Sequence, residues 1–131
     1  MKTEPATWMR YAEENLAVAR LSFEEGLLNA CLQNAQQCIE KALKALIIEN
    51  GLAFKRTHSI QELTDQLTAA SVDAGLSEDE CELIDAIYLP SKYPVASVVP
   101  DLDLDADLCR HCIDTAQRVI YTAKEQRNPE P

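Results

Sequence analysis

Apolar residues recur at three- and four-residue steps along residues 28–50, the spacing that places side chains on one face of an α-helix. The stripe consists of Leu28, Cys31, Leu32, Ala35, Cys38, Ile39, Ala42, Leu43 and Leu46. The stretch contains no proline or glycine, and Asn50-Gly51 is typical of a helix end with glycine at C′. We therefore predict a central helix here, roughly 35 Å long at 1.5 Å per residue.

A polar stripe lies beside the apolar one on this predicted helix. It is formed by Gln33, Gln36, Gln37, Glu40 and Lys44, with Lys41 nearby. Spacing alone therefore predicts a helical scaffold whose central helix carries an apolar and a polar stripe side by side.

The segment before Gly26 carries a similar helical pattern of apolar residues, namely Trp8, Ala12, Leu16, Ala19 and Phe23. Thr7 precedes this stripe and is predicted to be the N-cap. The short connection at Gly26 predicts that this helix packs antiparallel against the central one.

Two capping boxes predict where the next helices begin. Ser59 is followed three residues later by Glu62, and Ser77 is followed likewise by Glu80. Pro90 is predicted to end the second of these helices, because proline lacks the N–H that a helix interior requires. Residues 89–100 contain three prolines among apolar residues, which predicts an ordered loop lying on the domain. A last helix then begins within residues 101–107, with Leu108, Cys109, Cys112, Ile113, Ala116, Val119 and Ala123 on its inner face.

These elements predict an all-α fold, an up-and-down bundle of four or five helices with a long central second helix. The 131 residues are expected to form a single domain over 1–131, with its core at about 7–125. A chain of this size buries roughly two thirds of the surface that its unfolded form exposes. Only three glycines are present, which also argues against a sheet-rich fold.

The charge balance narrows the function classes. Twelve Lys and Arg oppose twenty-two Asp and Glu, giving a net charge of −10, whereas duplex binders need a basic face. Generic DNA binding is therefore disfavoured, while a small cationic site or a basic partner is compatible. No run of about twenty apolar residues predicts a membrane span. The polar N-terminus does not resemble a signal peptide, so we expect a cytoplasmic protein.

The spacing of the cysteines suggests a metal site, but their positions on the predicted helices argue against one. Cys109 and Cys112 flank His111 in a short spacing, and Cys31 and Cys38 would complete four ligands. All four cysteines fall on predicted apolar stripes, as small core residues do, while His111 points the other way. An odd total of five, without an export signal, also argues against a disulfide framework.

The acidic run at residues 101–107 alternates as a calcium loop does. However, Ala106 occupies the position of the required glycine, and Cys112 that of the bidentate glutamate. The helix dipole stabilises carboxylates in the first turn of a helix, which explains this acidic run without a bound ion. We therefore predict no metal site and no cofactor.

Two further positions carry candidate chemistry. Lys92 and Tyr93 precede Pro94 and present a cation and a ring that can receive a phosphate and a base, although Tyr93 can equally anchor the loop by packing. His58 directly precedes the Ser59 cap, where it can cover a helix N-terminus or act as a general base.

Three motifs in this order resemble the HEPN domain family over about residues 7–125. They are Gln36-Gln37 followed by Glu40-Lys41-Ala42-Leu43-Lys44-Ala45-Leu46, then His58-Ser59-Ile60, then Lys92-Tyr93-Pro94 where the family usually has Arg-Tyr-Pro. The resemblance implies a helical bundle that is usually dimeric and binds a nucleotide. For the polar stripe of the central helix it implies two interpretations: a seam between two copies of the chain, or the floor of a nucleotide site whose glutamines meet a base edge and whose lysines meet phosphate. Members often work beside a minimal nucleotidyltransferase as two halves of a toxin–antitoxin pair.

Some HEPN proteins are metal-independent ribonucleases that use an Arg-x(4–6)-His motif. No arginine stands four to six residues before His58 or His111, so nuclease chemistry is not carried over. We expect a homodimeric module that binds a nucleotide or RNA, or partners a nucleotidyltransferase, through Gln37, Glu40, Lys41, Lys44, His58, Lys92 and Tyr93. Two alternatives remain: an atypical ribonuclease with His58 as base and Lys92 as electrostatic stabiliser, and a purely structural interaction protein.

Overall fold

The computed structural model describes residues 4–92 and 104–127, with the backbone alone at 88–92 and 127. It contains the helices α1 (Pro5–Glu24), α2 (Leu28–Glu49), α3 (Ile60–Ala69), α4 (Glu78–Lys92) and α5 (Ala106–Arg127). No strand occurs in these two described ranges. The predicted all-α class and the long second helix are therefore confirmed.

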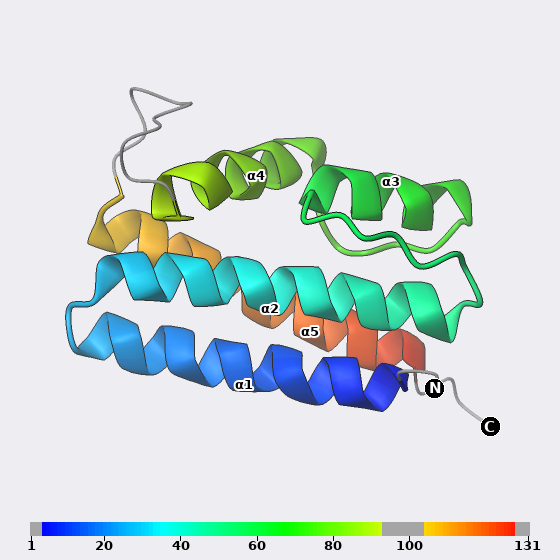
Figure 1. Ribbon diagram of the computed structural model, residues 1–131, viewed down its shortest axis with the longest axis horizontal. Coiled ribbons are helices and arrows are strands. Elements are labelled where there is room, and N and C mark those ends of the chain that lie inside the picture. The colour runs from blue at the N-terminus through cyan, green and yellow to red at the C-terminus, as the bar shows by residue number, and fades with distance from the viewer. Residues whose placement is uncertain (1–3, 93–103, 128–131) are drawn as a thin grey trace.

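α2 is the centre of the bundle and contacts α1, α3, α4 and α5 (Figure 1). α1 packs antiparallel on one side of α2, and α5 lies across this pair. The connection 50–59 turns back along α2, so α3 runs in the same direction as α2 and α4 returns beside it. α1 begins and α5 ends at the same end of the bundle (Figure 1). Lys124 Nζ, in the last turn of α5, lies 2.5 Å from Glu13 Oε2 in the middle of α1.

The core is formed by the predicted stripes. Every member of the α2 stripe except the half-buried Leu28 is buried, as are Ala12, Leu16 and Ala19 of α1. All five cysteines are free thiols in the interior, which confirms their interpretation as core residues. No helix within the described residues is both long and apolar enough to cross a membrane.

The two capping boxes differ in the structure. Ser77 N donates to Glu80 Oε1 (2.9 Å) and Glu80 N to Ser77 Oγ (3.1 Å), the full reciprocal pattern. At α3 only half forms: Ser59 Oγ accepts from Glu62 N at 3.2 Å. Thr57 Oγ1 takes the other part, since it accepts from Ser59 N (3.1 Å) and donates to Glu62 Oε2 (3.0 Å).

Two predicted helix boundaries are wrong. α1 begins at Pro5, two residues before Thr7, because a proline at the first helical position needs no hydrogen bond for its missing N–H. α4 passes Pro90 and ends two residues later at Lys92, although Pro90 has no N–H to donate to the carbonyl four residues earlier. The predicted loop therefore cannot begin at residue 89, and its residues 93–100 lie outside the described ranges.

Candidate functional site

Three polar residues of α2 are buried on the face that meets the 50–59 connection. Gln36, Glu40 and Lys44 are 2 %, 3 % and 6 % exposed, and their four-residue spacing stacks them along the helix. Lys44 Nζ donates to Glu40 Oε2 at 2.7 Å. Removing two charges from water is costly, so such a pair requires further hydrogen bonds to persist.

His58 supplies one of these contacts. Its Nδ1 lies 3.1 Å from both carboxylate oxygens of Glu40. The His58 side chain is 59 % exposed while that of Glu40 is 5 % exposed. Gln36 Nε2 completes the arrangement by donating to Glu40 Oε1 (3.3 Å) and to the His58 carbonyl (3.4 Å). The result is a surface imidazole held against a buried carboxylate.

Aromatic rings enclose Lys44 on its other side. Its Nζ lies 5.7 Å from the centre of the Trp8 ring and 5.5 Å from that of Phe54, within range of cation–π attraction. The two ring centres are 5.7 Å apart. The buried Trp8 Nε1 has no hydrogen-bond partner among the described residues. Lys44 therefore points into the protein between Glu40 and two rings.

α4 fixes the backbone next to His58. Asp85 Oδ1 accepts from Ile60 N (2.7 Å), and its Oδ2 accepts from Gln61 N (3.0 Å) and Ser59 Oγ (3.0 Å). A carboxylate at this position satisfies the exposed N–H groups at the start of α3 and interacts favourably with the helix dipole. Asp85 is not predictable from the sequence, because no local pattern links it to a helix start 25 residues earlier.

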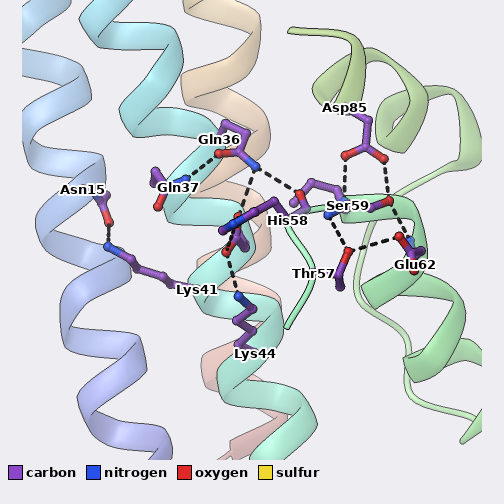
Figure 2. A network of polar contacts seen from close by, with 12 residues as sticks. Asn15, Gln36, Gln37, Lys41, Lys44, Thr57, His58, Ser59, Glu62 and Asp85 are labelled. Atoms are coloured by element: carbon purple, nitrogen blue, oxygen red, sulfur yellow. Dashed lines mark hydrogen bonds and ion pairs between the residues drawn. The ribbon is translucent and has the colours of Figure 1, made fainter. Parts of the chain in front are cut away.

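The structure brings some of the predicted site residues together and separates others (Figure 2). Glu40, Lys44 and His58 form one cluster, and Gln37 joins it by donating to Gln36 Oε1 at 2.8 Å. Lys41 is directed away from this cluster toward α1, where its Nζ donates to Asn15 Oδ1 at 2.8 Å.

The side chains of the remaining predicted site residues, Lys92 and Tyr93, lie outside the part of the chain that the structure describes. Lys92 is the last residue of α4, seven residues and roughly two helical turns beyond Asp85, and only its backbone is described. Tyr93 lies outside the described residues.

Burial also divides the polar stripe of α2. Gln36, Glu40 and Lys44 are covered within a single chain, so they are not surface available to a second copy. Gln33 and Gln37 are half-buried and remain at the edge of the stripe. A seam between copies would therefore involve these two glutamines rather than the ion pair.

The cluster is chemically suited to orienting an imidazole. A carboxylate facing Nδ1 favours the tautomer that carries its proton on Nδ1, which makes Nε2 the basic nitrogen of the neutral ring. Such a ring can accept a proton or a hydrogen bond from a ligand. Gln36 and Lys44 hold the carboxylate in place through hydrogen bonds of their own.

Comparison with known proteins gives the chain a family. The sequence model of the HEPN domain matches residues 6–126. The crystal structure of ST0689, an archaeal HEPN homologue, superposes with a TM-score of 0.72 at 26 % identity, covering 96 % of this chain and 99 % of that one. TT1696 from Thermus thermophilus gives a TM-score of 0.74, also at 26 % identity, covering 93 % and 97 %.

A curated relative matches a shorter stretch. "Putative toxin MJ1304" of Methanocaldococcus jannaschii is 39 % identical over 49 residues, which are 37 % of this chain and 32 % of that protein. The chain thus matches about a third of the length of this relative. The family match covers nearly the whole chain and agrees with the five-helix fold. The chain belongs to the HEPN domain family.

Proposed function

We propose that this chain is a toxin-type HEPN module that acts as a cytoplasmic homodimer and binds a nucleotide at the Glu40–His58 cluster. Its partner would be a minimal nucleotidyltransferase, the other half of a toxin–antitoxin pair. Family membership and the similarity to a protein named as a toxin support the class. Gln37, Lys92 and Tyr93 are proposed to complete the ligand site.

One observation carries the proposed site. His58 is mostly exposed, yet its Nδ1 contacts both oxygens of a carboxylate that is itself buried and paired with Lys44. An isolated surface histidine moves among rotamers, whereas this one is oriented before any ligand arrives. Orientation in advance reduces the entropy lost on binding, which favours a ligand-binding role for the ring.

Calorimetric titration of ATP and GTP tests the nucleotide site. We expect the wild type to bind and His58→Ala to bind about tenfold more weakly, because one hydrogen bond to a charged group is lost. Lys41→Ala is the control: Lys41 follows Glu40 on α2, but its side chain contacts Asn15 rather than the cluster. Absence of binding at millimolar nucleotide would retire this site, and light scattering measures the dimer independently.

A ribonuclease is the second candidate, favoured by the Nδ1 contact with Glu40. In this scheme His58 accepts the proton of the attacking 2′-hydroxyl through Nε2, and Lys92 stabilises the charge that develops on the phosphate. A labelled RNA should be cleaved by the wild type and left intact by His58→Ala. Cleavage that survives this substitution would exclude the assignment.

A further inference from the structure

Lys55 and Arg56 differ from the other cationic side chains that the structure describes. Arg118 pairs with Glu80, Lys124 with Glu13, and Arg110 with Asp107. Others contact an amide or a ring, as Lys41 contacts Asn15. Lys55 and Arg56 are exposed and contact no acidic, amide or aromatic group among the described residues. An acidic chain thus presents two adjacent uncompensated positive charges.

The neighbours of these two cations are also exposed. Phe54 precedes them and is 44 % exposed, while the His58 side chain, two residues after Arg56, is 59 % exposed. A single exposed apolar side chain is common on protein surfaces and indicates nothing by itself. Phe54 matters because two cations follow it directly, and a ring beside cations suits a ligand that is both anionic and aromatic. Residues 54–58, which we call the basic–aromatic segment, therefore offer an accessible ring, two cations and, after Thr57, an imidazole.

Hydrogen bonds hold this segment at both ends. Leu52 N donates to Ile47 O at 3.0 Å, and Gln66 Nε2 donates to Ala53 O at 2.6 Å. At the other end, Ser59 N donates to Thr57 Oγ1 (3.1 Å), and the His58 carbonyl accepts from Gln36. The backbone that carries the exposed side chains is thus fixed against α2 and α3. A ligand would lose little free energy in ordering it.

We propose that the basic–aromatic segment binds a single-stranded nucleic acid. Lys55 and Arg56 would contact successive phosphates, Phe54 would stack on an unpaired base, and His58 would lie beside the backbone. A duplex cannot offer a base to Phe54, because its bases are stacked inside the helix. An acidic protein would match the two cations but not the exposed ring. The inference extends the proposed nucleotide site, with which it shares only His58.

Fluorescence anisotropy with labelled 12-nucleotide RNA and DNA strands tests this assignment, with a duplex of the same sequence for comparison. We expect both single strands to bind the wild type at low salt and the duplex to bind much more weakly. Tighter binding of RNA than of DNA would identify a contact with the 2′-hydroxyl. The double variant Lys55→Glu/Arg56→Glu should lose at least tenfold in affinity.

The matched control is Arg20→Glu/Arg110→Glu, which changes the net charge by the same amount. Both arginines are exposed and lie at the end of the bundle opposite to the 50–59 connection. This control should bind single strands nearly as the wild type does. An equal loss in both double variants would mean that only total charge matters, which would overturn the proposal.

Salt dependence gives a second, quantitative readout. Each phosphate neutralised on a single strand contributes about 0.7 to the slope of log affinity against log salt concentration. Neutralisation of two phosphates by Lys55 and Arg56 therefore predicts that Lys55→Glu/Arg56→Glu lowers the slope by about 1.4. A slope that is the same in wild type and variant would contradict the phosphate contacts.

Phe54 requires a conservative rescue, because it also packs against Trp8 and Lys44. Phe54→Ala should weaken strand binding roughly 5- to 150-fold, the range for loss of one stacked base. Phe54→Tyr keeps the ring and should bind as the wild type does. If Phe54→Ala keeps full affinity while its helical circular dichroism is unchanged, the stacking contact is wrong.

The experiments distinguish a failure of this inference from a failure of the proposed nucleotide site. Loss of strand binding in Lys55→Glu/Arg56→Glu with unchanged ATP titration supports the segment as a site distinct from the Glu40–His58 cluster. Absence of mononucleotide binding with intact strand binding would contradict the proposed function and leave the segment assigned. If the wild type binds neither single strand at low salt, the assignment of the segment is wrong, whatever the nucleotide titration shows. Binding of an acidic peptide in preference to both strands would also overturn this assignment.

Discussion

The ion pair of Glu40 and Lys44 behaves differently from the exposed pairs of the same molecule. Lys124 and Glu13 are about half exposed, and such surface pairs contribute about 0–1 kcal/mol. Glu40 and Lys44 are almost fully buried, so loss of one partner leaves the other charge without compensation. The consequence of a substitution here depends on whether one charge or both are removed.

Glu40→Ala should lower the free energy of unfolding by about 3–5 kcal/mol, because Lys44 remains buried without its carboxylate. Glu40→Leu/Lys44→Met should cost much less, since both charges are replaced by apolar groups of similar size. Urea denaturation measures both. Glu13→Ala is the control for an exposed pair and should cost under about 1 kcal/mol. If the double change costs more than the single one, the burial argument fails.

Residue patterns located part of this cluster in advance. Glu40 and Lys44 share a helical face with Gln36 by spacing alone, and His58 is a candidate from its place before the Ser59 cap. The contact between His58 and Glu40 depends on the path of the 50–59 connection. This connection has no periodic pattern of apolar residues from which its path could be predicted. The basic–aromatic segment was missed for the same reason: exposure of its ring and its two cations follows from tertiary packing and not from local sequence.

The connection between α3 and α4 is joined to α5 at Gly75. This residue has φ +77°, a region that side chains with a Cβ rarely adopt. Arg118 Nε donates to its carbonyl at 3.1 Å, and a Cβ added to Gly75 would lie 2.8 Å from Thr122 Oγ1. Two independent reasons therefore require glycine: the backbone conformation and the close approach of α5.

Gly75→Ala should destabilise the protein more than Gly26→Ala does. Gly26 has a similar φ of +74°, but no atom lies within 4 Å of a Cβ added there, so its substitution costs only backbone strain, about 1–2 kcal/mol. Thermal unfolding compares the two variants. Adding Thr122→Ala to Gly75→Ala removes the hydroxyl in conflict and should restore part of the loss. Equal destabilisation by the two glycine changes would contradict the steric role of Thr122.

Helix types were predictable and helix ends less so. Apolar spacing gave α1, α2 and α5, and the Ser77–Glu80 box marked the start of α4. The errors at Thr7 and Pro90 both involve a proline, but in different ways: Pro5 suits the first helical position, where its missing N–H would have no partner, whereas α4 continues for two residues past Pro90 despite the hydrogen bond lost there. Local signals identify residues that suit a boundary, while packing decides which residue is used.

Across the whole molecule, burial raises the pKa of all five cysteine thiols. Burial raises the pKa of Cys31, Cys38 and Cys112 from 9.0 to about 12, and desolvation is the largest cause in each case. Burial also raises the pKa of Cys81 and Cys109. The folded protein therefore holds thiol protons more tightly than the unfolded chain. This contribution to stability is complete below pH 9 and is lost as the pH rises toward 12.

Iodoacetamide at pH 8 should leave the native thiols unmodified and alkylate all five after denaturation, because the thiolate is the reactive form and the sulfurs are buried. Mass spectrometry counts the modified sites. Between pH 9 and 11, the free energy of unfolding should fall, and Cys38→Ala/Cys112→Ala should reduce the slope of this fall. Rapid alkylation of the native protein would show that the core opens or that these sulfurs are accessible.

The position of the helix ends has a consequence for chain connectivity. α1 begins at the end of the bundle where α5 ends, and Lys124 in the last turn of α5 pairs with Glu13 in the middle of α1. A short linker from residue 127 to residue 4 would therefore bridge neighbouring points on one side of the bundle, and the chain could be opened instead at the exposed turn around Gly26. We expect the contacts of α2 with the other helices to form in such a permuted chain as well, because the permutation breaks the chain only in an exposed turn. A circularly permuted form would keep both the cluster and the basic–aromatic segment in an unbroken stretch of chain.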